Sequence, residues 1–236
     1  MIRKALEYIV ELSKPVLNEI NGQTYSDKPL KRVSYIPYAE SIELSTLTSL
    51  VDYIKLNRDN LPLPQIIHVV SPTCVKMYSS LDEDRNREKA VEVRASVPSF
   101  NFNQFTEKEA FVIGLQSKFI DFADRSLLLK FAGTVENGTV ATYGDDGVTQ
   151  KATIKTGIAS RSEAIVPNPV MLQPYRTFSE VPQPASHFIF RMRENRGVEC
   201  AIFEADGGAW KNEAMKNIKQ YLEKELKDID GFIIIS

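Results

Sequence analysis

The stretch from Tyr143 to Trp210 constrains the fold more than any other part of the chain. Short runs of β-type residues alternate there with clusters of glycine, proline, asparagine and aspartate. Such clusters supply the backbone angles that tight turns need, so we expect short strands joined by loops of fixed shape. Functional residues are often carried on loops of this kind. No set of residues in the stretch, however, specifies a reaction.

Runs of β-type residues occur in both halves of the chain. The runs at 66–71 and 74–81 are separated only by Pro72 and Thr73, which predicts a hairpin or a sharp corner. Gly-Asp-Asp-Gly at 144–147 predicts a second hairpin, because Asp-Gly accommodates the positive φ angles of a tight turn. Further runs lie at 90–97, 170–178, 187–193 and 198–204.

Helical periodicity marks the two ends and the middle of the chain. Residues 1–20 place apolar side chains roughly on one face and predict an N-terminal helix, followed by a polar linker at 21–41. Ser45 is expected to cap a short helix, and Thr106 with Glu109 is expected to form the capping box of another. Two more helices are predicted at 124–132 and 209–227.

Helices and strands fall in separate blocks, which predicts an α+β fold rather than alternating βαβ units. We expect antiparallel β-sheets with an N-terminal helical half and a packed C-terminal helix. The pattern divides into a helix and linker (1–40), a helix–β–helix half (41–122) and a β-rich half with the C-terminal helix (123–236), together one compact unit. Trp210 is expected in the core, where the C-terminal helix would pack against the β-rich half.

The C-terminal residues Phe-Ile-Ile-Ile-Ser at 232–236 are expected to pair with another strand, because an unpaired apolar strand is an adhesive edge. The partner strand belongs either to the same chain or to a second copy. The second alternative predicts a homo-oligomer.

Composition excludes several classes of protein. The chain has 29 basic and 31 acidic residues and a net charge of −2, which argues against a protein whose main task is to grip duplex DNA. Cys74 and Cys200 lie in apolar runs and are expected to be buried free thiols. No run of about 18 apolar residues occurs, so no membrane span is expected. These features predict a protein of a reducing cytoplasm.

Two acidic features could carry chemistry. Asp145 and Asp146 could hold a divalent metal ion or act as acid and base, but Asp-Asp-Gly is also ordinary turn chemistry. Asp206 is expected to cap the last helix, and Gly207 and Gly208 would let a ligand approach the N–H groups of that helix start. The alternative is a capped helix start without a ligand.

Arginines near aromatic residues form the third candidate. Arg176 lies between two prolines in the loop region, and Arg191 and Arg193 alternate on one predicted strand, so that they share a face. Such a surface could bind a nucleotide or a single strand through stacking and charge. The alternative is a solvated strand face. His68 and His187 stand alone, and no cofactor and no metal site are predicted.

Several segments carry a resemblance to a known group of proteins. They are HVVSPTCVKMYSSL, DRNRE, FNFNQFTEKEAFVIGLQSKF, GDDGVTQKATIKTG, VPNPVMLQPYRTFSEVPQPASHFIFRMR and AIFEADGGAWKNEA, and they span roughly residues 40–235. They resemble a family of uncharacterised bacteriophage and prophage proteins and, more remotely, the YfdQ-like phage proteins. The resemblance implies a protein of the infected bacterial host's cytoplasm. It implies no reaction, so the catalytic residues stay unknown.

Three functions remain open at this point. The first is a non-enzymatic phage binding protein that acts on a nucleotide, a nucleic acid or a host protein such as a defence component. The second is a metal-dependent hydrolase or nuclease that uses Asp145, Asp146, Glu204 and Asp206. The third is a structural or virion-associated protein.

Overall fold

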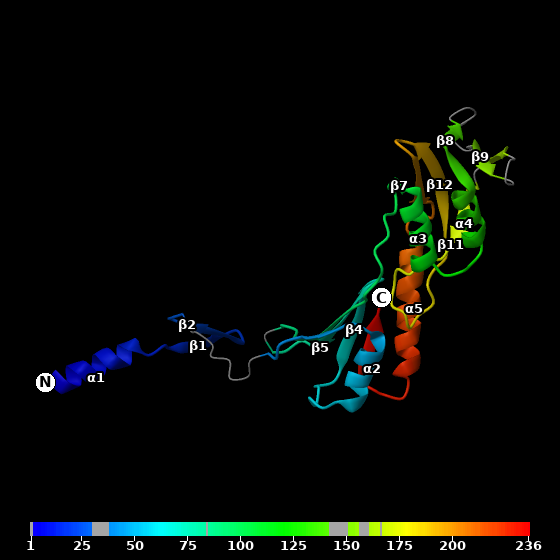
Figure 1. The fold of residues 1–236 in the computed structure, drawn as a ribbon. Coiled ribbons are helices and arrows are strands. Elements are labelled where there is room, and N and C mark those ends of the chain that lie inside the picture. The colour runs from blue at the N-terminus through cyan, green and yellow to red at the C-terminus, as the bar shows by residue number, and fades with distance from the viewer. Residues whose placement is uncertain (1, 30–37, 84, 142–150, 156–160, 166) are drawn as a thin grey trace. The chain divides into compact units, whose positions relative to one another are not determined.

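The computed structural model describes residues 2–29, 38–83, 85–141, 151–155, 161–165 and 167–236. The chain forms two units, Met1–Ala39 and Glu40–Ser236 (Figure 1). Helices and several sheets occur in separate blocks, so the expected α+β class is confirmed.

The first unit consists of a helix and a hairpin. Helix α1 (Ile2–Ser13) is followed by strands β1 (Leu17–Ile20) and β2 (Gln23–Ser26), which pair antiparallel. The expected helix over 1–20 is therefore wrong in its second half. Pro15 explains the early end, because a proline disfavours helical geometry in the residue before it and lacks a backbone donor. The expected linker at 21–41 also contains β2.

In the second unit, the first sheet has the strand order β14-β4-β5-β6-β3. Its strands are β3 (Ile42–Leu44), β4 (Gln65–Ser71), β5 (Cys74–Ser79), β6 (Lys89–Arg94) and β14 (Phe232–Ile235). The β4–β5 hairpin is confirmed. The C-terminal strand pairs, as expected, and its partner is β4 of the same chain. Both edge strands run parallel to their neighbours, which corrects the expectation of purely antiparallel sheets.

Two helices bury their apolar stripes against this sheet. They are α2 (Leu47–Leu56) and α5 (Ala209–Glu225), and they lie side by side in Figure 1. The resulting first core joins Leu50 of α2, Ile67 and Met77 of the sheet, and Ile218 of α5. The cap of α2 is Thr46 rather than Ser45, since the Thr46 side chain accepts the backbone N–H of Ser49.

A second core surrounds another sheet. Its strand order is β11-β12-β13-β7. The strands are β7 (Thr106–Glu107), β11 (Val170–Leu172), β12 (Ser186–Glu194) and β13 (Val198–Glu204). Helices α3 (Lys108–Lys118) and α4 (Arg125–Thr134) cover it. Glu107, not Thr106, caps α3. The stacked rings of Phe111 and Phe190, 5.6 Å apart, join α3 to β12.

The third sheet of this unit is small and has the order β10-β9-β8. Its strands are β8 (Val135–Ala141), β9 (Lys151–Lys155) and β10 (Arg161–Ile165). The expected Gly-Asp-Asp-Gly hairpin, with Asp145 and Asp146, lies outside the described residues.

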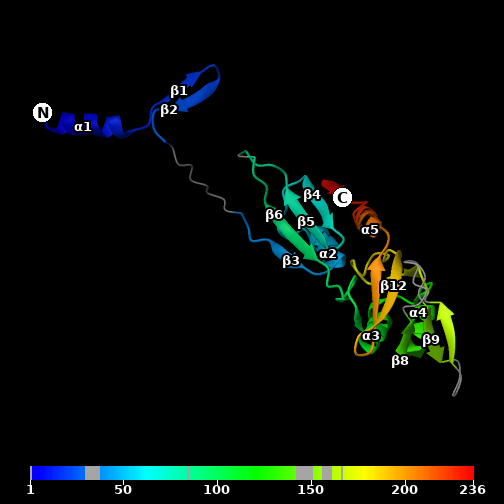
Figure 2. The same ribbon diagram turned by 90° about the horizontal axis from the view of Figure 1, so that it is seen from above.

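The two cores do not follow the expected division of the chain at residue 122. Helix α3 packs in the core of the later strands, whereas α5 packs on the earlier sheet, as Figure 2 also shows. The buried residues of α5 are Ala214, Ile218 and Leu222. Trp210, in the first turn of α5, is half-buried and belongs to neither core, so its predicted core position is wrong. Trp210 shares the helical face of Ala214, Ile218 and Leu222, but it lies in the first turn of α5, where the Arg176 guanidinium covers its ring.

Candidate functional site

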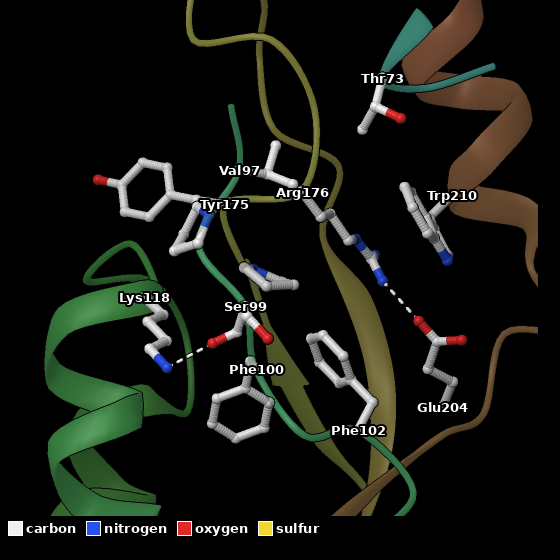
Figure 3. A pocket seen from close by; sticks show the side chains of 12 residues that line it. Thr73, Val97, Ser99, Phe100, Phe102, Lys118, Tyr175, Arg176, Glu204 and Trp210 are labelled. Atoms are coloured by element: carbon white, nitrogen blue, oxygen red, sulfur yellow. Dashed lines mark hydrogen bonds and ion pairs between the residues drawn. The ribbon is translucent and has the colours of Figure 1, made fainter. Parts of the chain in front are cut away.

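A cavity of about 300 Å³ lies in the second unit, where segments of both cores meet (Figure 3). Thr73 comes from the β4–β5 turn, Lys118 from the end of α3, and Trp210 from the start of α5. Most of the lining is apolar. The apolar lining residues are Val97, Pro98, Phe100, Phe102, Pro174 and Tyr175.

Arg176 is the central polar residue of this cavity. Its side chain is only 6% exposed. Nη1 donates to Glu204 Oε1 at 3.0 Å, and Nη2 donates to the Ser186 hydroxyl. The guanidinium lies over the Trp210 ring, 3.9 Å from its centroid. Figure 3 shows the Arg176 side chain extending toward Trp210 and Glu204, with the Phe102 ring below it. A buried arginine is therefore held by an ion pair and by a stacked aromatic ring.

Gln183 holds the loop that carries Arg176. The buried side-chain Oε1 of Gln183 accepts the backbone N–H groups of Arg176 at 2.9 Å and Thr177 at 3.1 Å. Its Nε2 donates to the Phe178 carbonyl at 2.9 Å. The Thr177 hydroxyl in turn donates to the Pro72 carbonyl at the β4–β5 turn, at 2.5 Å. Hydrogen bonds from side chains thus satisfy the backbone groups of this loop, as hydrogen bonds between strands do in a sheet.

Asp206 continues the polar network toward α5. The Ser186 hydroxyl donates to Asp206 Oδ2 at 2.6 Å, and the Gly208 N–H donates to Oδ1 at 3.0 Å. Burial raises the pKa of Asp206, but these hydrogen bonds and the charge of Arg176 outweigh it and leave the pKa below its ordinary value. Gly207 and Gly208 have φ angles of 63° and 83°, a region that favours glycine.

The expected anion site at this helix start is not supported. Gly208, rather than Asp206, is the N-cap residue. The Gly208 N–H is occupied by the Asp206 carboxylate, whose negative charge would repel a phosphate group. Asp206 therefore orders the turn before α5 and links it to Ser186 and Arg176.

The positive charges of the cavity are already engaged. Lys118 Nζ donates to the Ser99 carbonyl, and Arg176 is paired with Glu204. Burial lowers the pKa of the Arg176 guanidinium to about 10, although Glu204 and Asp206 oppose that shift. The lining contains these two cations and one carboxylate, Glu204, whereas Asp206 lies outside the lining and is linked to Arg176 through Ser186.

Two buried N–H groups in the wall have no acceptor among the described residues. They are Arg176 Nε and Trp210 Nε1. A buried donor without an acceptor is rare in folded proteins and calls for an explanation. Both side chains line the cavity.

The structure brings together only part of the sequence-predicted site. Ser186 links Arg176 to Asp206, and Asp206 accepts the backbone N–H of Gly208, as described above. Arg191 and Arg193 share the outer face of β12, as expected, because the intervening Met192 is buried. They do not line the cavity. Arg193 is paired with Glu199 at 2.5 Å and lies over the Phe105 ring at 4.2 Å.

Sequence reasoning missed the apolar part of the site. Phe102 and Lys118 carry no local signal for a cavity, because both are far from Arg176 in the chain. The proline-flanked Tyr175-Arg176 pair was the one usable hint. For Trp210 the sequence predicts a core position, whereas the structure places it in the cavity wall.

The described part of the chain gives no support to a metal site or to a reactive Cys200 thiolate. No group of three or more His, Cys, Asp or Glu residues there could hold a metal ion. Burial raises the pKa of the Cys200 thiol to about 12, so it is not a thiolate nucleophile at neutral pH. Both cysteines are buried and free, as expected. Over the same residues, we find no helix with the length and apolar character of a membrane span.

Comparison with protein-family models, with curated proteins and with solved structures finds no match to this chain.

Proposed function

We propose that the protein is a non-catalytic binding protein whose cavity takes a small, flat, largely uncharged molecule of the nucleobase or nucleoside class. The observation that carries this proposal is the stacked Arg176–Trp210 pair, whose Nε and Nε1 donors lack acceptors among the described residues. An unmade hydrogen bond at a buried donor costs about 1–3 kcal/mol. A ligand that offers an acceptor there removes this cost.

The size and lining of the cavity agree with such a ligand. Its volume of about 300 Å³ is at the small end of the range for ligand pockets. Ligand pockets are mostly apolar and contain a few well-placed polar groups, which describes this lining. A base has a flat π face for contact with Tyr175, Phe102 or Trp210 and acceptor atoms at its edge.

The charges favour a neutral base over a phosphate group. Lys118 and Arg176 are both engaged, and Glu204 and Asp206 lie close to Arg176. Phosphate recognition uses arginine or lysine donors that are available to the ligand. A nucleoside is therefore expected to bind at least as tightly as its monophosphate.

The setting of this activity rests on the resemblance to phage proteins, and we retain the infected bacterial cell as part of the proposal. No described contact favours the host-protein or virion alternatives. The metal-dependent alternative receives no support either, because Glu204 is bound to Arg176 and Asp206 to Ser186 and Gly208. Asp145 and Asp146 lie outside the described residues.

Fluorescence titration tests the proposal directly, because Trp210 is the only tryptophan of the chain and lines the cavity. Purified protein is titrated with the common nucleosides and with their monophosphates. At least one nucleoside should give a saturable change in tryptophan emission and a higher melting temperature. Short single-stranded oligonucleotides form a third series, and tighter binding of these would overturn the nucleoside assignment.

Two tyrosine variants provide the matched comparison. Tyr175→Ala removes an exposed ring from the cavity wall and should weaken nucleoside binding without loss of folding. Tyr25→Ala removes a similarly exposed ring from β2 and should bind like the wild type. If no nucleoside changes the emission or the melting temperature of the folded wild type, the proposal fails.

A further inference from the structure

Glu204 is the acidic residue of the cavity lining, and its carboxylate has unused capacity for hydrogen bonds (Figure 3). The side chain is 27% exposed. Arg176 Nη1 donates to Oε1, and we find no further donor to this carboxylate among the residues that the structure describes. A carboxylate can accept about four hydrogen bonds. A ligand in the cavity can therefore donate to Glu204.

Asp206, the other carboxylate of this network, is already occupied. It lies outside the lining, and the Ser186 hydroxyl and the Gly208 N–H donate to its two oxygens. Glu204 is therefore the carboxylate that a bound molecule meets.

The polar groups of the wall differ in what they require of a ligand. The N–H groups of Arg176 and Trp210 that lack an acceptor can only donate, so they require acceptor atoms. The Glu204 carboxylate can only accept, so it requires a donor. The hydroxyls of Thr73 and Ser99 can do both and do not discriminate. Because Arg176 and Glu204 are in contact, the wall favours a ligand edge with a donor and an acceptor side by side.

An exocyclic amino group beside a ring nitrogen provides such an edge. Cytosine carries its amino group next to a ring nitrogen that accepts, and adenine carries its amino group between two such nitrogens. In uracil and hypoxanthine an oxo oxygen replaces the amino group. That oxygen would face the Glu204 carboxylate as a second acceptor, which is unfavourable. The ring N–H of uracil does not remove this conflict, because it lies between two oxo groups.

We propose that Glu204 is a specificity-determining residue, and that it selects bases with an exocyclic amino group over bases with an oxo group at the same position. This inference rests on the nucleoside function proposed above and names the nucleosides that the cavity prefers. Cytidine should bind more tightly than uridine, and adenosine more tightly than inosine. We expect a difference of about tenfold or more in each pair, because hydrogen bonds to a charged group are stronger than those between neutral groups.

Isothermal titration calorimetry on the full chain measures the dissociation constants of these four nucleosides and of guanosine. Equal affinities within both pairs would contradict the selectivity and leave the nucleoside function standing. Tightest binding of uridine, inosine or guanosine would also contradict it, since guanine has an oxo group at the position of the amino group of adenine. If none of the five binds, the nucleoside function fails, and this inference fails with it.

Glu204→Gln tests whether Glu204 is the cause of the selectivity. Glutamine has nearly the same shape, keeps an oxygen for Arg176 and adds an N–H group that can donate to an oxo oxygen. The ratio of the uridine to the cytidine dissociation constant should fall from about tenfold toward one. Both constants are measured on the same variant, so a general loss of affinity or stability cancels in the ratio. An unchanged ratio would show that another group selects the base.

Glu199→Gln is the matched control. Glu199 pairs with Arg193 as Glu204 pairs with Arg176, but it does not line the cavity. This variant should keep the ratio of the wild type. A change as large as that in Glu204→Gln would mean that the ratio reports the loss of any negative charge, and it would overturn the role of Glu204. The wild-type ratio decides the selectivity itself even if Glu204→Gln does not fold.

Discussion

Two places in the second unit, which we call the Arg176 corner and the Arg193 corner, each contain a guanidinium, an aromatic ring and a carboxylate, but in different surroundings. At the cavity, the Arg176 guanidinium stacks on Trp210 and pairs with Glu204. On the β12–β13 hairpin, the Arg193 guanidinium stacks on Phe105 and pairs with Glu199. The distances are similar, but the Arg176 side chain is 6% exposed and that of Arg193 is 51% exposed. The contacts alone therefore do not distinguish the two sites.

This comparison indicates that burial determines how much such an ion pair contributes to the stability of the fold. An exposed ion pair contributes about 0–1 kcal/mol, because water screens it and competes for both partners. A buried pair is costly to form, but removal of one partner leaves a charge without compensation. The backbone differs as well, since Arg193 lies in a regular ladder and Arg176 lies in a loop held by Gln183. We expect the Arg176 corner to respond strongly to substitution and the Arg193 corner weakly.

The largest expected effect is that of Arg176→Ala. It should lower the free energy of unfolding by about 3 kcal/mol, because it leaves Glu204 and Ser186 without their charged partner and uncovers the Trp210 ring. Urea unfolding followed by circular dichroism measures the change. An exposed ion pair contributes at most about 1 kcal/mol. A loss no larger than this in Arg176→Ala would show that burial does not make the two corners different.

Gln183→Leu should rank second. Leucine fills a similar volume but leaves the backbone N–H groups of Arg176 and Thr177 without their acceptor, which should cost about 2 kcal/mol. The same unfolding measurement applies, with Gln104→Leu at an exposed position as the control. Equal stabilities of the two variants would show that the loop does not depend on Gln183.

Low pH should affect the stability of the two corners differently, because Asp206 is linked to Arg176 and not to Arg193. Its pKa lies below the ordinary value of 3.8 in the folded protein. The unfolded chain therefore binds the proton more tightly, so this stabilisation is present above pH 3.8 and is lost as the pH falls through the lower, folded-state pKa. Arg176→Ala should reduce this loss, because the charge of Arg176 contributes to the shift.

Melting temperatures between neutral pH and pH 3 measure the acid effect. Asp206→Asn serves as the reference without the titrating group. Arg193→Ala should keep the acid dependence of the wild type. If the acid dependence of Arg176→Ala equals that of the wild type, the charge of Arg176 does not act on Asp206.

The smallest expected effect is that of Arg193→Ala itself. It removes an exposed pair and a cation–π contact, and the free energy of unfolding should fall by about 0.5 kcal/mol. Urea unfolding in low and high salt measures it, and salt should diminish the difference. A cost near that of Arg176→Ala would mean that the hairpin end is buried in solution, for example in an assembly.

The sequence predicted those elements whose cause is local. The β4–β5 hairpin follows from turn residues between two β-type runs, β12 and β13 follow from the runs at 187–193 and 198–204, and α5 follows from its apolar spacing. The errors of one residue at the caps of α2 and α3 arise because Ser45 and Thr46, or Thr106 and Glu107, offer neighbouring acceptors. The geometry of the first turn chooses between them.

The candidate site was less predictable than the fold. Residue type and local turn chemistry point to Arg176, Asp206 and the two glycines. The structure links Arg176 to Asp206 through Ser186, and Asp206 accepts the Gly208 N–H. Arg191 and Arg193, which the sequence groups with Arg176, are not among the residues that line the cavity. Nothing local could show that Phe102 and Tyr175 lie in one wall.

The sequence by itself determined the α+β class, the order of most elements, the buried cysteines and the pairing of the C-terminal strand. These features depend on periodicity and turn residues within short segments. Only the tertiary structure decided that α5 packs on the early sheet, that Trp210 leaves the core, and that Arg176 is buried beside Glu204. The physical reason is that burial and ion pairing depend on segments far apart in the chain, and these meet only when both cores have formed.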